Sequence, residues 1–207
     1  GNITIDTTTG TVSIDLVRAG ATRSGDLWLN ALGGGIQEAG TGDAAEDILV
    51  NEVFITATAG IGDVNPLELR VDELTGSSSS AGGIDLNETD DLKIHDLTTQ
   101  LGDILLDLAG GDLTLDLIRA GALRQNDLTI TTLGGSLLET DVDADADLQA
   151  RNVTLNVSGS IAQQGGGYLE TWIEELIAQT TAPGSIELDE VDALILQDVN
   201  TDRKSVV

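Results

Sequence analysis

Cysteine and methionine are absent from this chain, and aromatic side chains nearly so: the sequence contains two Trp, one Tyr and one Phe. The lack of cysteine excludes disulfide bonds and thiolate-ligated metal sites. The core must therefore be built from Leu, Ile, Val and Ala. These residues are interrupted by 25 glycines but only two prolines. Small aliphatic residues between frequent glycines are typical of short strands joined by tight turns.

Positively charged residues are also scarce. Nine Lys and Arg residues stand against 36 Asp and Glu residues, which gives a formal net charge of −27. A surface of this sign repels the phosphates of nucleic acids and the headgroups of anionic lipids. Long apolar runs are also lacking, since none approaches the roughly 18 residues of a membrane-spanning helix. We therefore expect no nucleic-acid partner and no membrane insertion.

The ends of the chain differ from those of a typical complete protein. The sequence starts at Gly1 rather than Met, and it shows no signal peptide. Residues 202–207 (DRKSVV) place two basic residues together in a chain that has very few. We interpret the chain as a piece of a longer protein, and residues 202–207 as a non-native tail that arose as an artefact of sequence assembly.

A long internal repeat organises the rest. The segment DLVRAGATRSGDL (15–27) returns as DLIRAGALRQNDL (116–128), and GIDLNE (83–88) returns as SIELDE (185–190). The chain therefore contains two copies of one unit, residues 1–101 and 102–201. A catalytic loop is normally needed once, whereas a structural unit that stacks on its own copies recurs. The repeat thus favours a structural role.

Each unit is a series of short runs that alternate between apolar and polar residues, such as NITID (2–6) and DLTLD (112–116). Alternation with a period of two predicts half-buried strands. One segment, 168–179, is ambiguous because its apolar residues fall at helical spacing. It is either a short helix or, like its counterpart in the first unit, a strand.

Two folds accept many short strands: a right-handed parallel β-helix (a β-solenoid), or two β-sandwich domains. Sandwiches predict a linker near residue 100 and hairpin turns such as Asn-Gly, but strand patterns continue through 95–112 and such turns are absent. We therefore predict an all-β chain that forms one continuous β-solenoid over residues 1–201. Apolar residues at matching places in the two units should point into its core. These pairs are Ile14 with Leu115, Leu16 with Leu117, and Val53 with Val153.

Several ordered strings resemble a known group of proteins. They include GNITID…GTVSIDLVRAG…GDLWL…GGGI (1–36), AGIGDVNPLELRVDELTG (59–76) and SGSIAQQGGGYLETWIEELIAQ (158–179). These strings are similar to the repeats of filamentous-haemagglutinin-type and other very large repetitive adhesins of Gram-negative bacteria. The resemblance extends over nearly all of residues 1–201. It implies a secreted, surface-associated β-helical stalk or passenger region without catalytic residues.

One acidic segment, DVDADADL (141–148), is a candidate metal site. Its aspartates are Asp141, Asp143, Asp145 and Asp147. Several carboxylates close together are the ligands that Ca²⁺ prefers. An EF-hand loop would require Gly and Glu where Ala146 and Asn152 stand, so this segment is not of that type. Two interpretations remain: a Ca²⁺ site, or a solvated acidic turn.

The arginines repeat together with the scaffold. Arg18 matches Arg119, and Arg23 matches Arg124. A catalytic base would not need to be duplicated in this way. We therefore expect these arginines to pair with acidic residues of neighbouring coils, such as Asp15 and Asp116.

Together these features predict a non-catalytic stalk or passenger segment of a bacterial adhesin, located outside the cell or on its surface. Its expected partners are flanking solenoid repeats of the same longer chain and host-surface or matrix carbohydrates or proteins. Two alternatives belong to other classes: a fragment of a β-helical carbohydrate-active enzyme, and a Ca²⁺-stiffened spacer. The enzyme would need an acidic cleft with a base, and the single histidine, His95, has no partner evident in the sequence. We expect no enzymatic activity and no cofactor other than Ca²⁺.

Overall fold

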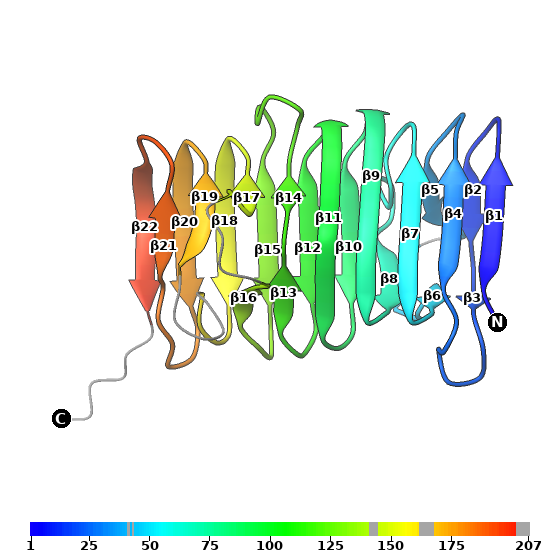
Figure 1. The fold of residues 1–207 in the computed structure, drawn as a ribbon, viewed down its shortest axis with the longest axis horizontal. Helices are drawn as coiled ribbons and strands as arrows, with labels where there is room; N and C mark the ends of the chain where they lie inside the picture. Colours follow the sequence, from blue (N-terminus) through cyan, green and yellow to red (C-terminus); the bar gives the residue numbers. More distant parts are fainter. Residues whose placement is uncertain (41, 43, 141–144, 162–167, 202–207) are drawn as a thin grey trace.

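The chain folds into a β-solenoid of about eight turns, which Figure 1 shows as an elongated stack of strands. The structure, a computed structural model, describes residues 1–40, 42, 44–140, 145–161 and 168–201. Within these ranges the structure contains β-strands and no helix, and the paired strands run parallel. The alternative of two β-sandwiches is therefore wrong, because sandwich sheets are built from antiparallel strands.

Two long sheets form the walls of the solenoid. Sheet A contains, in order along the axis, β1 (Ile3–Thr7), β4 (Leu27–Ala31), β7 (Glu52–Ala57), β9 (Glu73–Ala81), β11 (Leu92–Leu101), β14 (Ile118–Arg119), β17 (Leu148–Gln149), β19 (Leu169–Trp172) and β21 (Leu188–Glu190). In addition, β13 (Leu113–Leu115) pairs with β11, and β16 (Leu137–Glu139) pairs with β13. Sheet B contains β3 (Val17–Arg18), β6 (Ile48–Leu49), β8 (Leu67–Arg70), β10 (Ile84–Glu88), β12 (Ile104–Leu108), β15 (Leu128–Thr132), β18 (Asn152–Val157), β20 (Glu175–Thr180) and β22 (Ile195–Thr201). A short pair, β2 (Val12–Ile14) and β5 (Ile36–Glu38), continues toward β10 through the bridges Ile36–Ile61 and Ile61–Ile84.

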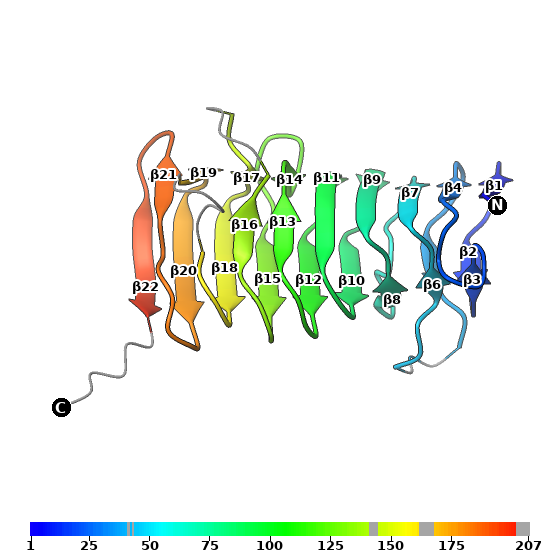
Figure 2. The ribbon, with the colours of Figure 1, turned by 60° about the horizontal axis from the view of Figure 1, so that its bottom comes forward.

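The chain alternates between the two sheets, so each full turn adds one strand, or two short strands in line, to each wall (Figures 1 and 2). Backbone hydrogen bonds between successive turns therefore run along the axis of the rod. Strands β1 and β22 lie at its opposite ends. Stacking of this kind needs only short strands and corners, which is why frequent glycines and short alternating runs specify it.

Aliphatic side chains stack in register along the inside of each wall. In sheet A, one buried ladder consists of Leu27, Val53, Leu74, Ile94 and Leu115. Each such side chain contributes about 1.5–3 kcal/mol through its removal from water. Large rings would not fit this narrow interior, which accounts for the nearly aromatic-free composition.

The predicted inward-facing pairs are confirmed for Ile14 with Leu115 and for Val53 with Val153, all of which are buried. The prediction for Leu16 and Leu117 is wrong, because Leu16 is 53% exposed and Leu117 is half-buried. Strand β2 ends at Ile14 and β3 begins at Val17, so the strand is interrupted at Leu16 within one wall of the solenoid. The interruption resets the inward–outward alternation.

The helical alternative for residues 168–179 is wrong as well. Leu169–Trp172 form β19 and Glu175–Thr180 form β20, separated by a corner. Leu169, Ile173 and Leu176 are all buried. A corner between two strands therefore produced the spacing that resembles a helix.

The two sequence repeats face opposite sides of the rod. Strand β4 lies in sheet A, whereas its counterpart β15 lies in sheet B; β8 lies in sheet B and its counterpart β19 in sheet A. One repeat therefore comprises an odd number of half-turns. Figure 1 shows the consequence, because the loop between β3 and β4 projects from one edge and the matching loop between β14 and β15 projects from the other.

Candidate functional site

The predicted acidic segment lies partly within the described residues. Asp141 and Asp143 lie outside them, and Asp145 is exposed. Asp147 is buried and meets two carboxylates, Glu139 of the same turn and Glu170 of the next turn. One ligand oxygen from each of these three residues lies within 4.8 Å of the others. The candidate set is therefore Glu139, Asp147 and Glu170, which we call the second carboxylate triad.

A matching set exists in the first unit. Glu38, Asp47 and Glu68 also place their carboxylate oxygens within 4.8 Å of one another. We call these residues the first carboxylate triad. Glu38 ends β5, Asp47 directly precedes β6, and Glu68 lies in β8, so three strands bring the set together. Because the two units face opposite sides, the two triads do too.

Sequence analysis missed Glu68 and Glu170 because each comes from the next turn, far along the chain from its partners. Their positions are fixed by the same backbone contact in both triads. The Glu68 amide donates to Asp47 Oδ2 at 3.2 Å, and the Glu170 amide donates to Asp147 Oδ2 at 3.0 Å. The signal that could have revealed them is the repeat itself, since all three acidic positions recur in both units.

Two carboxylates of the first triad, Asp47 and Glu68, have a raised proton affinity. Burial, followed by the nearby charges of Glu68 and Glu38, raises the pKa of Asp47 to about 7, although the bond from the Glu68 amide opposes the shift. Burial likewise raises the pKa of Glu68. Either a proton or a hard cation such as Ca²⁺ would relieve this repulsion. The triads therefore have the chemistry of proton- or cation-sensitive joints between turns.

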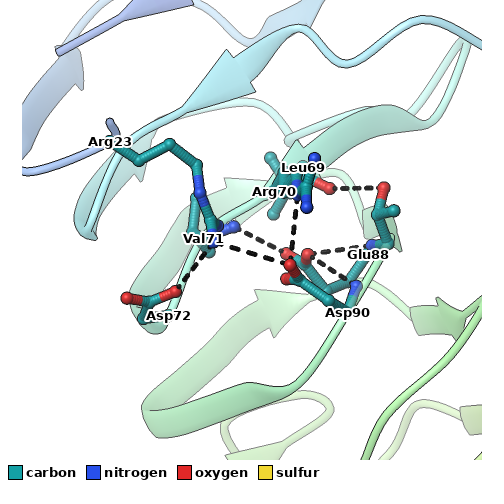
Figure 3. Close-up of polar contacts among 8 residues, drawn as sticks. Arg23, Leu69, Arg70, Val71, Asp72, Glu88 and Asp90 are labelled. Carbon is teal, nitrogen blue, oxygen red and sulfur yellow. Dashed lines mark hydrogen bonds and ion pairs between the residues drawn. The ribbon is translucent and has the colours of Figure 1, made fainter. Parts of the chain in front are cut away.

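A second repeated cluster lies at a corner of the solenoid (Figure 3). Arg23 reaches forward from the loop between β3 and β4, and its Nη2 lies 3.4 Å from Asp72 Oδ1 and 3.5 Å from Asp90 Oδ2. Arg70 Nε donates to Asp90 Oδ2 at 3.1 Å. The expectation of arginine pairing with acidic residues holds for Arg23, but its partners lie farther along the rod than Asp15.

Beneath this cluster lies the buried carboxylate of Glu88. It accepts hydrogen bonds from the backbone amides of Val71, Thr89 and Asp90, which hold the corner in place (Figure 3). Burial raises its pKa to about 8 even though these amides favour the ionised form. The role of this carboxylate is therefore to satisfy backbone donors at a turn.

The second unit rebuilds the same corner with a tryptophan. Arg124 matches Arg23, and its guanidinium carbon lies 3.7 Å from the centre of the Trp172 ring. Trp172, at the place of Arg70, donates from Nε1 to Asp192 Oδ2 at 2.8 Å. Glu190 accepts from the Ile173 and Asp192 amides, as Glu88 does in the first unit. Since the donor to the aspartate is kept while the cation changes to a ring, this cluster has a bracing role.

His95 has a partner that the sequence did not reveal. Its Nε2 lies 2.5 Å from Glu73 Oε2, and Glu52 completes a group of three. Burial, then the charges of Glu73 and Asp26, raises the pKa of Glu52, and His95 opposes this shift. The sequence showed no partner for His95, and the structure supplies one from the preceding turn.

A groove of about 590 Å³ crosses several turns nearby, and its lining includes His95, Asp96, Asp116 and Trp172. Trp172 is 38% exposed, and Arg124 covers one face of its ring. Trp28 and Phe54 stack on the outer side of sheet A with ring centres 5.2 Å apart. These are the places where a sugar or peptide could meet an aromatic surface.

Comparison with known proteins gives no relative: no protein-family model, no curated protein and no solved structure matches this chain. A separate search of the described residues found no helix with the length and apolarity needed to cross a membrane.

Proposed function

We propose that this chain is a non-catalytic stalk or passenger segment of a secreted or cell-surface bacterial adhesin. The observation that carries the proposal is the uninterrupted axial stacking of turns, in which each strand pairs with the strands of the turns before and after it. Such a rod separates its two ends by a large distance with few residues. The resemblance to filamentous-haemagglutinin-type repeats supports the surface location.

The bracing clusters favour the same role. Arg23 links one turn to acidic residues of turns farther along the axis, and Arg124 does the same to Trp172 on the opposite side. Contacts that skip a turn resist bending and peeling at the edge of the stack. A rod that must transmit force benefits from this arrangement.

Two experiments test the proposal. An antibody raised against residues 1–201 should label intact, non-permeabilised cells of the source bacterium, and external protease should remove the signal. Pulling the isolated chain along its axis should release turns in small, repeated steps, because each turn contacts chiefly its neighbours. Labelling that requires permeabilisation, or unfolding in one or two large domain-sized steps, contradicts the proposal.

A calcium-stiffened spacer is the second candidate, and the duplication of the carboxylate triads favours it. A cation bound at Glu38, Asp47 and Glu68 would tie two successive turns together, and the matching set would do so on the opposite side. A comparison of thermal stability in calcium chloride and in sodium chloride of equal ionic strength tests this candidate.

The carbohydrate-active enzyme remains an alternative proposal for the groove beside Trp172. A panel of acidic and neutral polysaccharides, assayed for both binding and cleavage, separates it from an adhesin. Binding that is weakened by Trp172→Ala without any cleavage supports the adhesin. Cleavage that Asp116→Asn abolishes while binding persists supports the enzyme.

A further inference from the structure

Three side chains with metal-binding atoms converge on the outer side of sheet A. Glu52 lies in β7, Glu73 in β9 and His95 in β11, so three successive turns each contribute one residue. One ligand atom of each lies within 4.8 Å of the others. All three are half-buried, which leaves the group open to solvent on one side.

A β-bulge directs the histidine toward this group. Strand β11 pairs in register with β9 up to Ile94, and pairing resumes at Asp96, so His95 is the extra residue. A bulge re-aims the side chain of the extra residue. His95 Nε2 consequently comes within 2.5 Å of Glu73 Oε2, although it is the only histidine of the chain.

The second unit shows what a purely structural version of this group looks like. Asn152, Glu175 and Gln197 occupy the places of Glu52, Glu73 and His95. Gln197 Nε2 donates to Glu175 Oε2 at 3.1 Å, so a neutral amide makes the same contact as the imidazole. A hydrogen bond between turns therefore requires neither a histidine nor a second carboxylate at this place.

The first unit, unlike the second, has two carboxylates side by side in this group, and their repulsion must be offset. Glu52 and Glu73 stand directly beside each other on paired strands, and two like charges in this position repel. Lys93 pairs in register with Glu73 from the other side and partly offsets that repulsion. A divalent cation held between both carboxylates and the imidazole would offset it fully.

We propose that Glu52, Glu73 and His95 form a binding site for a divalent transition-metal ion of the zinc class. One imidazole nitrogen with two carboxylate oxygens is a donor set that suits Zn²⁺, whereas Ca²⁺ prefers oxygen ligands alone. Water completes the coordination on the open side. The metal would tie three turns of sheet A together.

The single histidine makes a direct test simple. Zinc chloride is titrated into the whole chain at pH 7 in excess CaCl₂, which occupies any oxygen-only sites. The imidazole resonances of His95 are followed by NMR, and the stoichiometry is measured by calorimetry. We expect one zinc ion per chain with a shift of the His95 resonances. An unchanged imidazole spectrum at saturating zinc overturns the proposal.

Three variants refine the test. His95→Gln recreates the native Gln197–Glu175 pair, so it should fold and should weaken zinc binding more than about tenfold, since the loss of even an outer-shell partner costs roughly 10–100-fold. Glu175→Gln, at the matching place in the second unit, should leave binding unchanged. Asn152→Glu with Gln197→His should create a second zinc site. Binding that survives His95→Gln, or a folded double variant without a second site, counts against the proposal.

Discussion

Asp85 lies on the outer side of β10, half-buried among other acidic residues. Burial, then the charges of Asp107, Asp63 and Glu68, raises its pKa from 3.8 to about 6. The folded chain therefore holds a proton at Asp85 that the unfolded chain has already released between about pH 4 and pH 6. The contribution of Asp85 to the free energy of unfolding is therefore highest below this pH window and decreases as the pH rises through it.

Replacing this aspartate with its neutral isostere should remove that dependence. We expect Asp85→Asn to stabilise the fold at pH 8 by roughly 1 kcal/mol, after allowance for solvent screening of a half-exposed group, and to have no effect at pH 3. Thermal melts across this pH range measure it. Asp189→Asn, at an exposed aspartate, controls for the general loss of charge. An equal gain in both variants would mean that net charge alone is responsible.

Arg23 and Arg124, which we call the arginine braces, should respond differently to salt. Arg23 acts through ion pairs, so Arg23→Ala should cost about 0.5–1 kcal/mol at low salt and almost nothing in 1 M NaCl. Arg124 stacks on a ring and donates to the Trp172 carbonyl, so Arg124→Ala should cost about 1 kcal/mol with less dependence on salt. Denaturant melts at two salt concentrations decide this, with the exposed Arg18→Ala as the control.

Both braces carry a second feature that the alanine variants leave unchanged. Arg23 and Arg124 have φ angles of 56° and 57°, in the left-handed region that favours glycine. Arg23→Gly should therefore be more stable than Arg23→Ala, since it removes the same side chain but relieves the backbone. If the two variants have the same melting temperature, the backbone conformation at this position does not affect stability.

At the scale of the elements, close contact between successive turns depends on glycine. The Leu-Gly-Gly sequence repeats at 32–34 and 133–135. A Cβ atom at Gly135 would overlap the carbonyl oxygen of Gly111 in the preceding turn, and one at Gly34 would overlap that of Gly10. These glycines therefore permit the backbone of one turn to approach that of the next.

We expect Gly135→Ala to destabilise the fold by about 2 kcal/mol or more, because the obstructing atoms are backbone and cannot move aside without breaking the stack. Gly110→Ala is the matched control, since its nearest neighbour would be the Thr89 carbonyl oxygen at 3.5 Å, an ordinary contact. Chemical denaturation of both variants measures the difference. Similar stabilities would show that the turns can separate locally without cost.

The strands and the type of fold were predictable because alternation and repetition are properties of the local sequence. Interruptions of the strands were less predictable. At Leu16 a break within one wall, and at 168–179 a corner between the two walls, restart the inward–outward pattern in a new phase. The carboxylate triads were only half predictable. Asp147 stands out locally, but Glu170 joins it through the pitch of the solenoid, which alternation does not specify.

At the scale of the whole molecule, the repeat distributes its features over two faces. Since each unit spans an odd number of half-turns, the carboxylate triads and the arginine braces of the two units lie on opposite sides. Bracing on both sides resists bending in either direction. The sequence repeat alone would suggest that both units present their features on the same side of the rod. The alternation of strands between the two sheets places them on opposite sides instead.

The net charge of −27 also acts on the rod as a whole, because like charges along its length oppose compaction. Salt screens such charges over a Debye length of about 10 Å at 0.1 M. We therefore expect the melting temperature to rise with added NaCl. No shift in NaCl would mean that the charges are already neutralised or too far apart to matter.

Calcium should do more than screen if the carboxylate triads bind it. At pH 8, where Asp47 is ionised, millimolar CaCl₂ should raise the melting temperature beyond the effect of NaCl at equal ionic strength. The additional gain should shrink at pH 5, where a proton occupies the first triad instead. Combining Asp47→Asn with Asp147→Asn should abolish it, while Asp189→Asn should not. Equal shifts in the two salts at pH 8 would mean that neither triad binds Ca²⁺ and would remove the calcium-stiffened spacer as a candidate.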